Sequence, residues 1–352
     1  MIIPWVANKL INKERVDYYL NQTALTRHFT NYGPSVQILE QKVREFFDIE
    51  DNKCVIAVTN GSVAVHILAA AIGYEKKKKL NWATQSFTFP PSAQANLKNV
   101  SILDIELDTG GLDIESVNSS IDGVIITNIF GNIVDLDKYE KWAQENNKAL
   151  IFDNAATCGT KYKGKNALNY GNGCGISFHH TKPFGFGEGG AIIADLKYEK
   201  YIRGLINFGI GLDQEHPQFT PEGTNGKMSD ISAAYILGYL ETNLNNIKTK
   251  LNDFYYHFKN ELQRRNITVC RLYPSFHDEG QIVPACICLL FSENRDMYLS
   301  KLSSVSACRK YYHPLKKMPN VNKVYESIIC LPCNIDMTID DLNSFLDIIE
   351  NN

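Results

Sequence analysis

Short apolar runs alternate with amphipathic stretches over roughly residues 36–240 of the chain. Apolar side chains at helical spacing predict helices at residues 36–47, 61–72 and 136–146. The apolar runs predict strands at residues 54–59, 100–104, 123–128, 149–152 and 190–195. This alternation indicates an α/β fold with a mainly parallel sheet flanked by helices. Ligands of such sheets bind at the carboxyl ends of strands, so the residues that follow each strand are candidates for function.

The pattern changes near residue 228, where a long helical stretch begins. The chain then shows two further apolar runs and a last amphipathic stretch, which predict strands at residues 269–272 and 282–291 and a helix at 338–349. We therefore expect a large domain at residues 1–240 and a smaller C-terminal α/β domain at 241–352. A chain of 352 residues is long enough for two domains of ordinary size.

Composition and charge narrow the class of protein. The hydrophobic fraction is 44% and the charged fraction is 21%, as in an ordinary globular enzyme. A net charge of −3 gives no broad attraction to nucleic acid, and the one basic run, Lys76 to Lys79, is interpreted as a solvated loop. The start lacks a signal-peptide pattern, and no apolar run is long enough to span a bilayer. We expect a soluble cytoplasmic protein with no membrane partner.

Nine cysteines are scattered along the chain, and the odd number argues against a disulfide scaffold. Cys330 and Cys333 have the CxxC spacing of many zinc and redox sites, and Cys286 and Cys288 lie upstream. The last two belong to an apolar run predicted to be a strand, where alternate residues share a face and buried thiols behave as small hydrophobic groups. We therefore expect no bound metal.

Lys182 is the first candidate for chemistry, because it lies between aromatic and glycine-rich residues in SFHHTKPFGFGEGG. Desolvation lowers the pKa of an ammonium group, and the neutral amine can then attack a carbonyl. Asp153 ends a predicted strand, where its carboxylate can pair with a pyridinium nitrogen. A surface lysine and a helix-capping aspartate are the alternatives when the two residues are taken singly.

Two weaker signals accompany this pair. Asn60, Gly61 and Ser62 close a strand and open a helix, where N–H groups and the helix dipole favour a phosphate. Phe89 follows Thr88 in a loop, where an aromatic ring can stack on a flat heterocycle. A plain capping turn and a core phenylalanine are the alternatives.

The glycines at 185–190 satisfy the GxGxxG spacing of dinucleotide-binding loops. That fingerprint needs a strand before it, a helix after it and an acidic residue about 20 positions on. Here the preceding residues are polar, an apolar strand follows, and Asp195 is too close. We expect no dinucleotide cofactor.

Together these motifs resemble the sugar aminotransferases of the DegT/StrS type, which depend on pyridoxal 5′-phosphate (PLP) and belong to fold type I. The resemblance covers nearly the whole chain, in order. It rests on Gly33-Pro34 with Glu40, Asn60-Gly61-Ser62, Thr88-Phe89, residues 128–131, Asp153 to Ala156, residues 177–190, residues 223–228 and Leu331-Pro332. The segment around Lys182 is the most specific of these motifs.

The resemblance implies roles for individual residues. It implies the cofactor-binding set Gly61, Ser62, Phe89, Asp153, Ser177, Lys182 and Asn225. Lys182 is the catalytic residue, which holds PLP as a Schiff base and moves protons, and Asp153 pairs with the pyridine nitrogen. Phe89 stacks on the ring. Asn225 reaches the phosphate of the neighbouring subunit, which implies a homodimer with shared active sites.

This sequence departs from the family pattern in places. Ala156 stands where the family usually has Gln or Glu near the 3′ oxygen of the cofactor. His179 lies in the lysine motif without an assigned role. One branch of the family has His in place of the lysine and performs dehydration, and Lys182 argues against that branch.

The reaction implied is transfer of an amino group from L-glutamate to a nucleotide-linked (UDP or dTDP) 4-keto-6-deoxyhexose, giving a 4-amino-4,6-dideoxy sugar of the viosamine type. Arg309, Tyr311 and Tyr312 resemble a segment of relatives that act on such sugars. The guanidinium group suits a diphosphate and the tyrosines suit a sugar, although a surface cluster is the alternative. A 3-keto substrate, a PLP-binding regulator without turnover, and a non-catalytic scaffold remain open.

Overall fold

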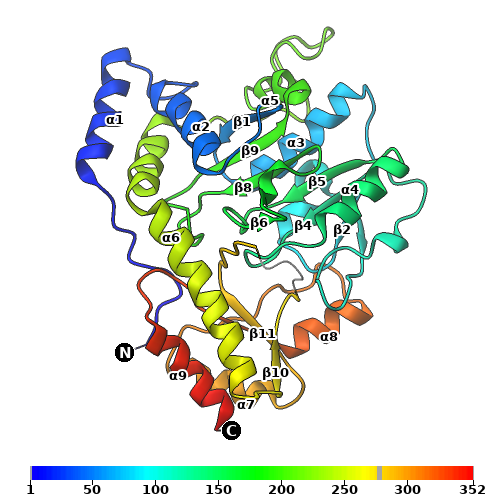
Figure 1. The fold of residues 1–352 in the computed structure, drawn as a ribbon. Coiled ribbons are helices and arrows are strands. Elements are labelled where there is room, and N and C mark those ends of the chain that lie inside the picture. The colour runs from blue at the N-terminus through cyan, green and yellow to red at the C-terminus, as the bar shows by residue number, and fades with distance from the viewer. Residues whose placement is uncertain (1, 276–279, 352) are drawn as a thin grey trace.

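The computed structural model describes residues 2–275 and 280–351 and contains a large sheet and a smaller one, which lies below it in Figure 1. The large sheet has the strand order β1 (Lys53–Val58), β9 (Gly190–Asp195), β8 (Gly173–Ser177), β5 (Ala149–Asp153), β4 (Gly123–Thr127), β2 (Trp82–Gln85) and β3 (Ser101–Leu103). β9 is antiparallel to both of its neighbours, and the other neighbouring pairs are parallel. The predicted α/β fold with a mainly parallel sheet is confirmed.

Helices cover both faces of the large sheet. Successive side chains of a strand point to opposite faces, and Val55 and Ala57 of β1 enter a different apolar cluster from Cys54, Ile56 and Val58. The first cluster includes α2 (Pro34–Phe46) and α4 (Leu136–Glu145), and the second includes α3 (Gly61–Glu75) and α5 (Glu199–Leu205). Burial on both faces explains why the strands are short apolar runs.

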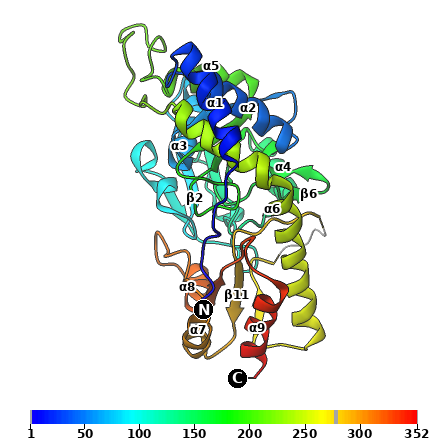
Figure 2. The same cartoon turned by 90° about the vertical axis from the view of Figure 1, so that its left-hand side faces the viewer.

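The smaller sheet is antiparallel and lies against the C-terminal helices. Its strands are β10 (Cys270–Leu272), β11 (Ile287–Phe291) and β12 (Ile328–Leu331). The remaining elements are α1 (Lys13–Thr26), the ribbon β6 (Lys161–Tyr162) and β7 (Lys165–Asn166), α6 (Asp230–Arg264), α7 (Arg295–Ser303), α8 (Pro319–Ser327) and α9 (Ile339–Glu350). α6 packs on α1 and α2 at one end and on α9 at the other, so it joins the two sheets (Figure 2). The boundary expected at residue 240 falls inside this unbroken helix.

Some strands escaped the sequence prediction, and one was placed too early. β8 and β12 were not predicted, and the strand expected from residue 282 begins only at Ile287. Upstream, the N–H groups of Val283 and Ala285 bond instead to Thr160 Oγ1 (3.0 Å) and to the carbonyl of Phe130 (2.8 Å). This stretch is therefore apolar because it is buried against loops of the large sheet.

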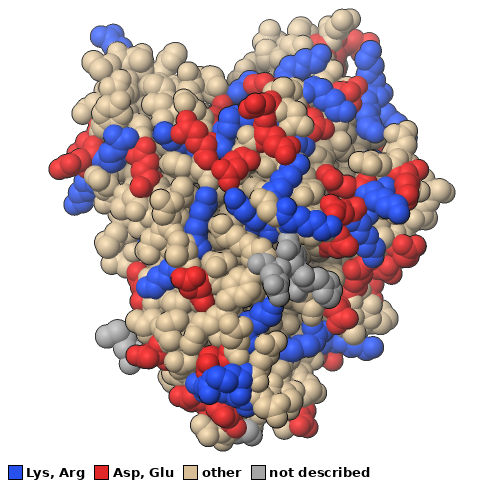
Figure 3. Space-filling model, in the orientation of Figure 1, with Lys and Arg blue, Asp and Glu red and all other residues tan. Residues whose placement is uncertain are grey.

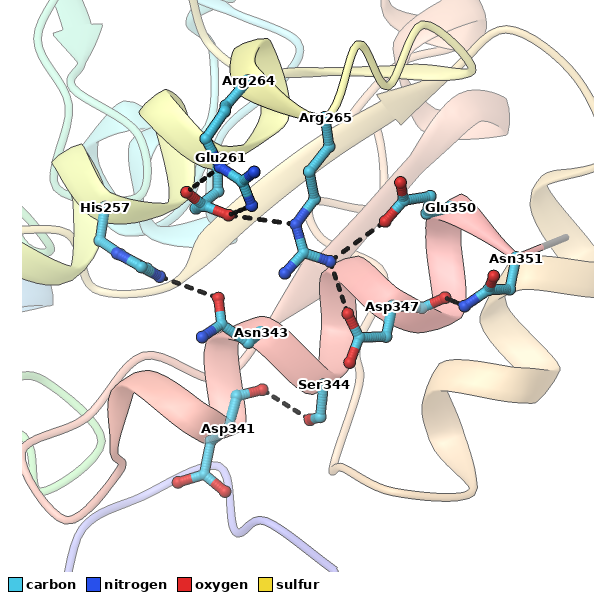
Figure 4. Close-up of polar contacts among 10 residues, drawn as sticks. All are labelled: His257, Glu261, Arg264, Arg265, Asp341, Asn343, Ser344, Asp347, Glu350 and Asn351. Atoms are coloured by element: carbon cyan, nitrogen blue, oxygen red, sulfur yellow. Dashed lines mark hydrogen bonds and ion pairs between the residues drawn. The ribbon is translucent and has the colours of Figure 1, made fainter.

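Polar contacts fix the far end of α6 to α9 (Figure 4). Arg265, which caps α6, pairs with Asp347 and Glu350 of α9 and with Glu261 one turn earlier. His257 Nε2 lies 3.0 Å from Asn343 Oδ1. These contacts hold the C-terminal helix in place.

The visible surface carries both signs of charge interspersed, without a large basic face (Figure 3). Among the described residues, no helix combines the length and the apolar character that a membrane span requires.

Candidate active site

A pocket of about 850 Å³ opens at the carboxyl ends of the parallel strands. Four strands supply residues just where they end: β1 leads to Asn60, β4 to Asn128, β5 to Asp153 and β8 to Ser177. The pocket also reaches the small sheet and the N-terminal segment. The candidates that line it are Gly61, Ser62, Phe89, Asp153, Ser177, Lys182, Tyr311 and Tyr312.

The start of α3 forms one end of the pocket. Asn60 caps the helix by accepting a hydrogen bond from the Val63 N–H at 2.9 Å. Within the described residues, the N–H groups of Gly61 and Ser62 have no hydrogen-bond partner. An added Cβ on Gly61 would lie 3.0 Å from Ser177 Cβ, so the two segments touch. Two N–H groups, two hydroxyls and a helix dipole therefore converge on a place suited to a phosphate.

Asp153, the last residue of β5, lines the same pocket and is buried. Its Oδ1 accepts a hydrogen bond from the Ala155 N–H at 3.1 Å, and its Oδ2 from the Ser92 hydroxyl at 3.3 Å. Burial raises the pKa of the Asp153 carboxyl, while the Ala155 N–H and the Lys182 ammonium oppose that rise. A cation that enters the pocket beside Asp153 therefore stabilises the ionised form of this carboxyl group.

Lys182 lies in a tight turn between β8 and β9. The Lys182 N–H bonds to the His179 carbonyl at 2.8 Å, and the Gly185 N–H bonds to the Lys182 carbonyl at 3.0 Å. A Cβ on Gly185 would lie 2.0 Å from the His179 oxygen, so this position accepts glycine alone. Burial lowers the pKa of the Lys182 ammonium, and the Asp153 carboxylate opposes that effect. The neutral amine, which is the nucleophilic and basic form, is therefore favoured.

These residues fit PLP. The cofactor carries a phosphate, a ring nitrogen that is cationic when protonated, and an aldehyde that reacts with an amine. The start of α3 suits the phosphate, and the buried carboxyl of Asp153 suits the ring nitrogen. The amine of Lys182, whose pKa is lowered by burial, suits the aldehyde. Their common pocket is large enough for a cofactor and a substrate together.

Two departures from the family pattern have structural consequences. Ala156 lines the pocket and offers no polar group. Asn128 also lines the pocket, but its side-chain amide donates to Asn154 Oδ1 at 2.7 Å and accepts from the Val134 N–H at 3.0 Å. The Asn128 side chain is thus committed to holding neighbouring loops.

His179 lines the pocket beside Lys182. Its Nδ1 lies 2.8 Å from Thr181 Oγ1, and its Nε2 lies 3.4 Å from a Glu188 carboxylate oxygen. Burial lowers the pKa of the imidazole, and Glu188 opposes this. The ring is therefore oriented from both sides at the pocket wall.

The residues expected to bind the substrate separate into two groups. Tyr312 lines the pocket and stacks on Phe130 with ring centroids 5.1 Å apart, and Tyr311 meets Trp5 edge-on at 5.7 Å. Arg309 does not line the pocket. Its guanidinium carbon lies 5.2 Å from the centre of the Trp5 ring, and the residue is exposed.

Asn225 likewise lies outside the pocket of its own chain. It is exposed and its backbone pairs with Asn207 at the base of a protruding loop, seen at the top of Figure 2. Within one chain, Asn225 is therefore not among the residues that line the pocket.

The structure adds residues that sequence reasoning missed. Trp5, Lys227, Ser229 and Ser232 line the pocket, and Ser92 bonds to Asp153. Lys227 lies in the recognised segment 223–228, and Ser229 and Ser232 follow it closely, so that motif could have pointed to all three. Trp5 and Ser92 had no local signal, because they approach the pocket through folding of distant segments.

Comparisons with known proteins identify the family of this chain. The sequence model of the DegT/DnrJ/EryC1/StrS aminotransferase family matches residues 11–350. The dTDP-4-amino-4,6-dideoxy-D-glucose transaminase of Shigella dysenteriae is 26% identical over 361 residues, covering 94% of this chain and 94% of that protein. The UDP-2-acetamido-2-deoxy-3-oxo-D-glucuronate aminotransferase of Pseudomonas aeruginosa is 28% identical over 219 residues, covering 59% of this chain and 58% of that protein.

The fold is also that of a solved relative. The structure of DesI in the presence of its TDP-sugar product matches with a TM-score of 0.81 and 23% identity, covering 97% of this chain and 91% of DesI. This likeness confirms the fold type I architecture that the motifs predicted. The chain belongs to the DegT/DnrJ/EryC1/StrS aminotransferase family.

Proposed function

We propose that this chain binds PLP and transfers an amino group from L-glutamate to a UDP- or dTDP-linked 4-keto-6-deoxyhexose, giving a 4-amino-4,6-dideoxy sugar of the viosamine type. The observation that carries the proposal is the convergence of Lys182, Asp153 and the start of α3 on one pocket. The activity named for the Shigella relative supports the 4-position and the dTDP carrier.

Each residue has a task in this proposal. Gly61, Ser62 and Ser177 bind the phosphate, Asp153 holds the ring nitrogen protonated, and Phe89 covers one ring face. PLP, when bound, supplies an electron sink for the carbon that loses a proton. Lys182 Nζ takes the proton from the Cα of glutamate and later delivers one to the sugar carbon that receives the amino group. One group can serve as base and then as acid when its pKa lies near the working pH.

A homodimer completes the proposed site. The loop before Asn225 exposes Phe208, Ile210 and Phe219, each between 44% and 52% accessible. Contiguous exposed apolar groups of this kind mark interaction surfaces. We place the partner subunit against this loop, so that Asn225 reaches the phosphate of the partner's cofactor.

A 3-keto sugar is the second candidate substrate, because the Pseudomonas relative is named for a 3-oxo sugar acid. The two substrates differ in which ring carbon must lie beside Lys182. A panel of UDP- and dTDP-linked 3-keto and 4-keto sugars, with glutamate as donor and the product identified by NMR, separates them. We expect a 4-amino product, and a 3-amino product would replace the first candidate by the second.

The cofactor itself is tested by absorbance. The purified chain incubated with PLP should absorb in the visible range, and addition of glutamate should bleach that band. A protein that stays colourless contradicts PLP binding. A colour that glutamate and other amino donors never change contradicts transamination and favours a PLP-binding regulator, whereas a non-catalytic scaffold would show neither response.

A further inference from the structure

Three cysteines from separate parts of the sequence meet beside the pocket. Cys286 precedes β11, Cys288 lies within it, and Cys330 lies on β12 directly opposite Cys288 in the sheet register. Their three Sγ atoms all lie within 4.8 Å of one another, and those of Cys286 and Cys288 are 3.5 Å apart. All three side chains are buried. The CxxC spacing suggested Cys333 as the neighbour of Cys330, but Cys333 is not part of this group in the described chain.

The separations of the sulfur atoms suit a metal ion. Tetrahedral zinc binds thiolates at about 2.3 Å, which places the sulfur atoms about 3.8 Å apart. The observed sulfur set needs shifts of only about 1 Å or less to reach that geometry. The backbone holds the three donors close together, because Cys288 and Cys330 are register partners on neighbouring strands and Cys286 lies two residues before Cys288, in the bend that precedes β11.

Charge decides which thiophilic cation fits. Three thiolates around a monovalent ion such as Cu⁺ leave a net charge of −2 in a buried site, whereas a divalent ion leaves −1. Each uncompensated charge in a buried site is unfavourable. A divalent cation of the zinc class is therefore favoured.

Of the three cysteines, Cys286 lines the pocket, and Cys288 and Cys330 are not among its lining residues. An ion held by all three would therefore have its fourth coordination position available on the pocket side. Three protein ligands with an open fourth position are the arrangement of zinc sites that exchange a ligand, and the pocket provides the entry path.

We propose that Cys286, Cys288 and Cys330 bind one zinc ion through three thiolates, with the fourth position open to the pocket beside Lys182. The proposal does not depend on which sugar the enzyme uses. Each thiol releases its proton to water on binding, and no oxidation occurs.

The test begins with the PLP-loaded full-length chain, freed of metal by a chelator under reducing conditions. Zinc sulfate is added, unbound metal is removed by desalting, and the zinc content is measured by atomic emission. We expect one zinc ion per chain. Cys288→Ala and Cys330→Ala should lose it, and Cys270→Ala, a buried thiol on β10 of the same sheet, should retain it.

A second measurement covers the case in which a variant does not fold. Zinc-edge X-ray absorption of the wild-type protein should show three sulfur neighbours and one nitrogen or oxygen neighbour. The proposal is overturned by a chain that retains no zinc, by equal retention in Cys288→Ala, or by a spectrum without sulfur. A Cys288–Cys330 disulfide that persists under reducing conditions would also overturn it.

Discussion

The side-chain nitrogen of Lys9 lies 2.7 Å from the backbone carbonyl oxygen of Lys182. The same nitrogen donates to the Pro183 carbonyl and to the Tyr239 hydroxyl, both at 3.1 Å. The N-terminal segment therefore holds the turn that carries the proposed catalytic lysine. Burial lowers the pKa of Lys9 to about 7, and Asp336 opposes the shift.

Replacement of Lys9 by methionine should change how stability depends on pH. The unfolded chain, with a lysine pKa near 10.5, binds this proton more tightly than the folded chain. Below pH 7 the buried ammonium charge of Lys9 destabilises the folded chain. The folded chain therefore becomes more stable as the pH rises from about 7 towards 10. In urea unfolding, the free energy of unfolding of wild type relative to that of Lys9→Met should rise by on the order of 1–3 kcal/mol between pH 7 and pH 10. The exposed Lys13→Met is the control, and parallel pH profiles for wild type and Lys9→Met would contradict this account.

Lys182→Ala should bind PLP through the phosphate end of the pocket but lose turnover. Removal of a general base and acid lowers the rate by about 10²–10⁴-fold, and loss of the nucleophile adds to that. Equilibrium dialysis with PLP and an assay of 2-oxoglutarate formation measure the two effects. Normal turnover by the variant would contradict the proposal that Lys182 is the catalytic residue.

Asp153→Asn should separate stability from activity. The raised pKa of the Asp153 carboxyl means that the cofactor-free fold loses stability as the pH rises from about 4 through that pKa. The variant should therefore melt at a higher temperature than wild type at pH 7 when both lack cofactor, and the difference should vanish near pH 3. Its turnover with PLP should fall by about 10²–10³-fold. A variant that is less stable than wild type at pH 7 speaks against a buried, disfavoured carboxylate.

The local parts of the site were predictable from sequence. Asp153 was placed on the pocket because an apolar run reveals where a buried strand ends. Ser177 was placed there only by the resemblance to the family, since β8, the strand that it ends, was not predicted. The partner of Asp153, Ser92, was not predictable, since it reaches the carboxylate from a short 3₁₀ turn 61 residues earlier. Lys9 was missed for the same reason. Its partners are backbone carbonyls 173 residues away, which leave no pattern in the sequence.

Mixing inactive chains tests the proposed dimer. Lys182→Ala and Asn225→Ala are each expected to be weak or inactive alone. After random exchange, about half of the dimers are hybrids of the two variants. If Asn225 serves the partner's site, each hybrid has one site with both Lys182 and Asn225 and one site with neither. One intact site in half of the dimers gives about one quarter of wild-type activity. Subunits are exchanged by mild denaturation and renaturation, and the same treatment of each variant alone is the control. Activity that never rises above the sum of the two variants contradicts a shared site.

Arg265→Ala should loosen the C-terminal helix. Arg265 links the end of α6 to two acidic residues of α9 (Figure 4). Pairs of this kind near the surface contribute about 1 kcal/mol or less and are screened by salt. The variant should unfold at slightly lower urea concentration, with a difference that shrinks in 1 M NaCl. Arg264→Ala, whose ion pair stays within α6, is the matched control and should have a smaller effect.

Sequence reasoning was weakest for contacts between the two sheets. The apolar stretch before Ile287 was assigned to a strand, since periodicity cannot distinguish burial in a sheet from burial against loops. The position of Arg309 has a similar origin. Its local sequence suited a diphosphate. The fold instead packs its guanidinium group against Trp5, a residue 304 positions earlier, and not in the lining of the pocket.

The N-terminal segment has a consequence for synthesis of the chain. Ile3 pairs with Val305 and Ala307 through backbone hydrogen bonds, and the Pro4 carbonyl accepts from Asn334. These docking partners leave the ribosome roughly 15–60 s after the first residues, at about 5–20 residues per second. Trp5 and Lys9 therefore cannot reach their positions beside the pocket and the Lys182 turn until residues 305–334 have been made. A nascent chain that lacks these residues leaves the wall of the pocket at Trp5 incomplete.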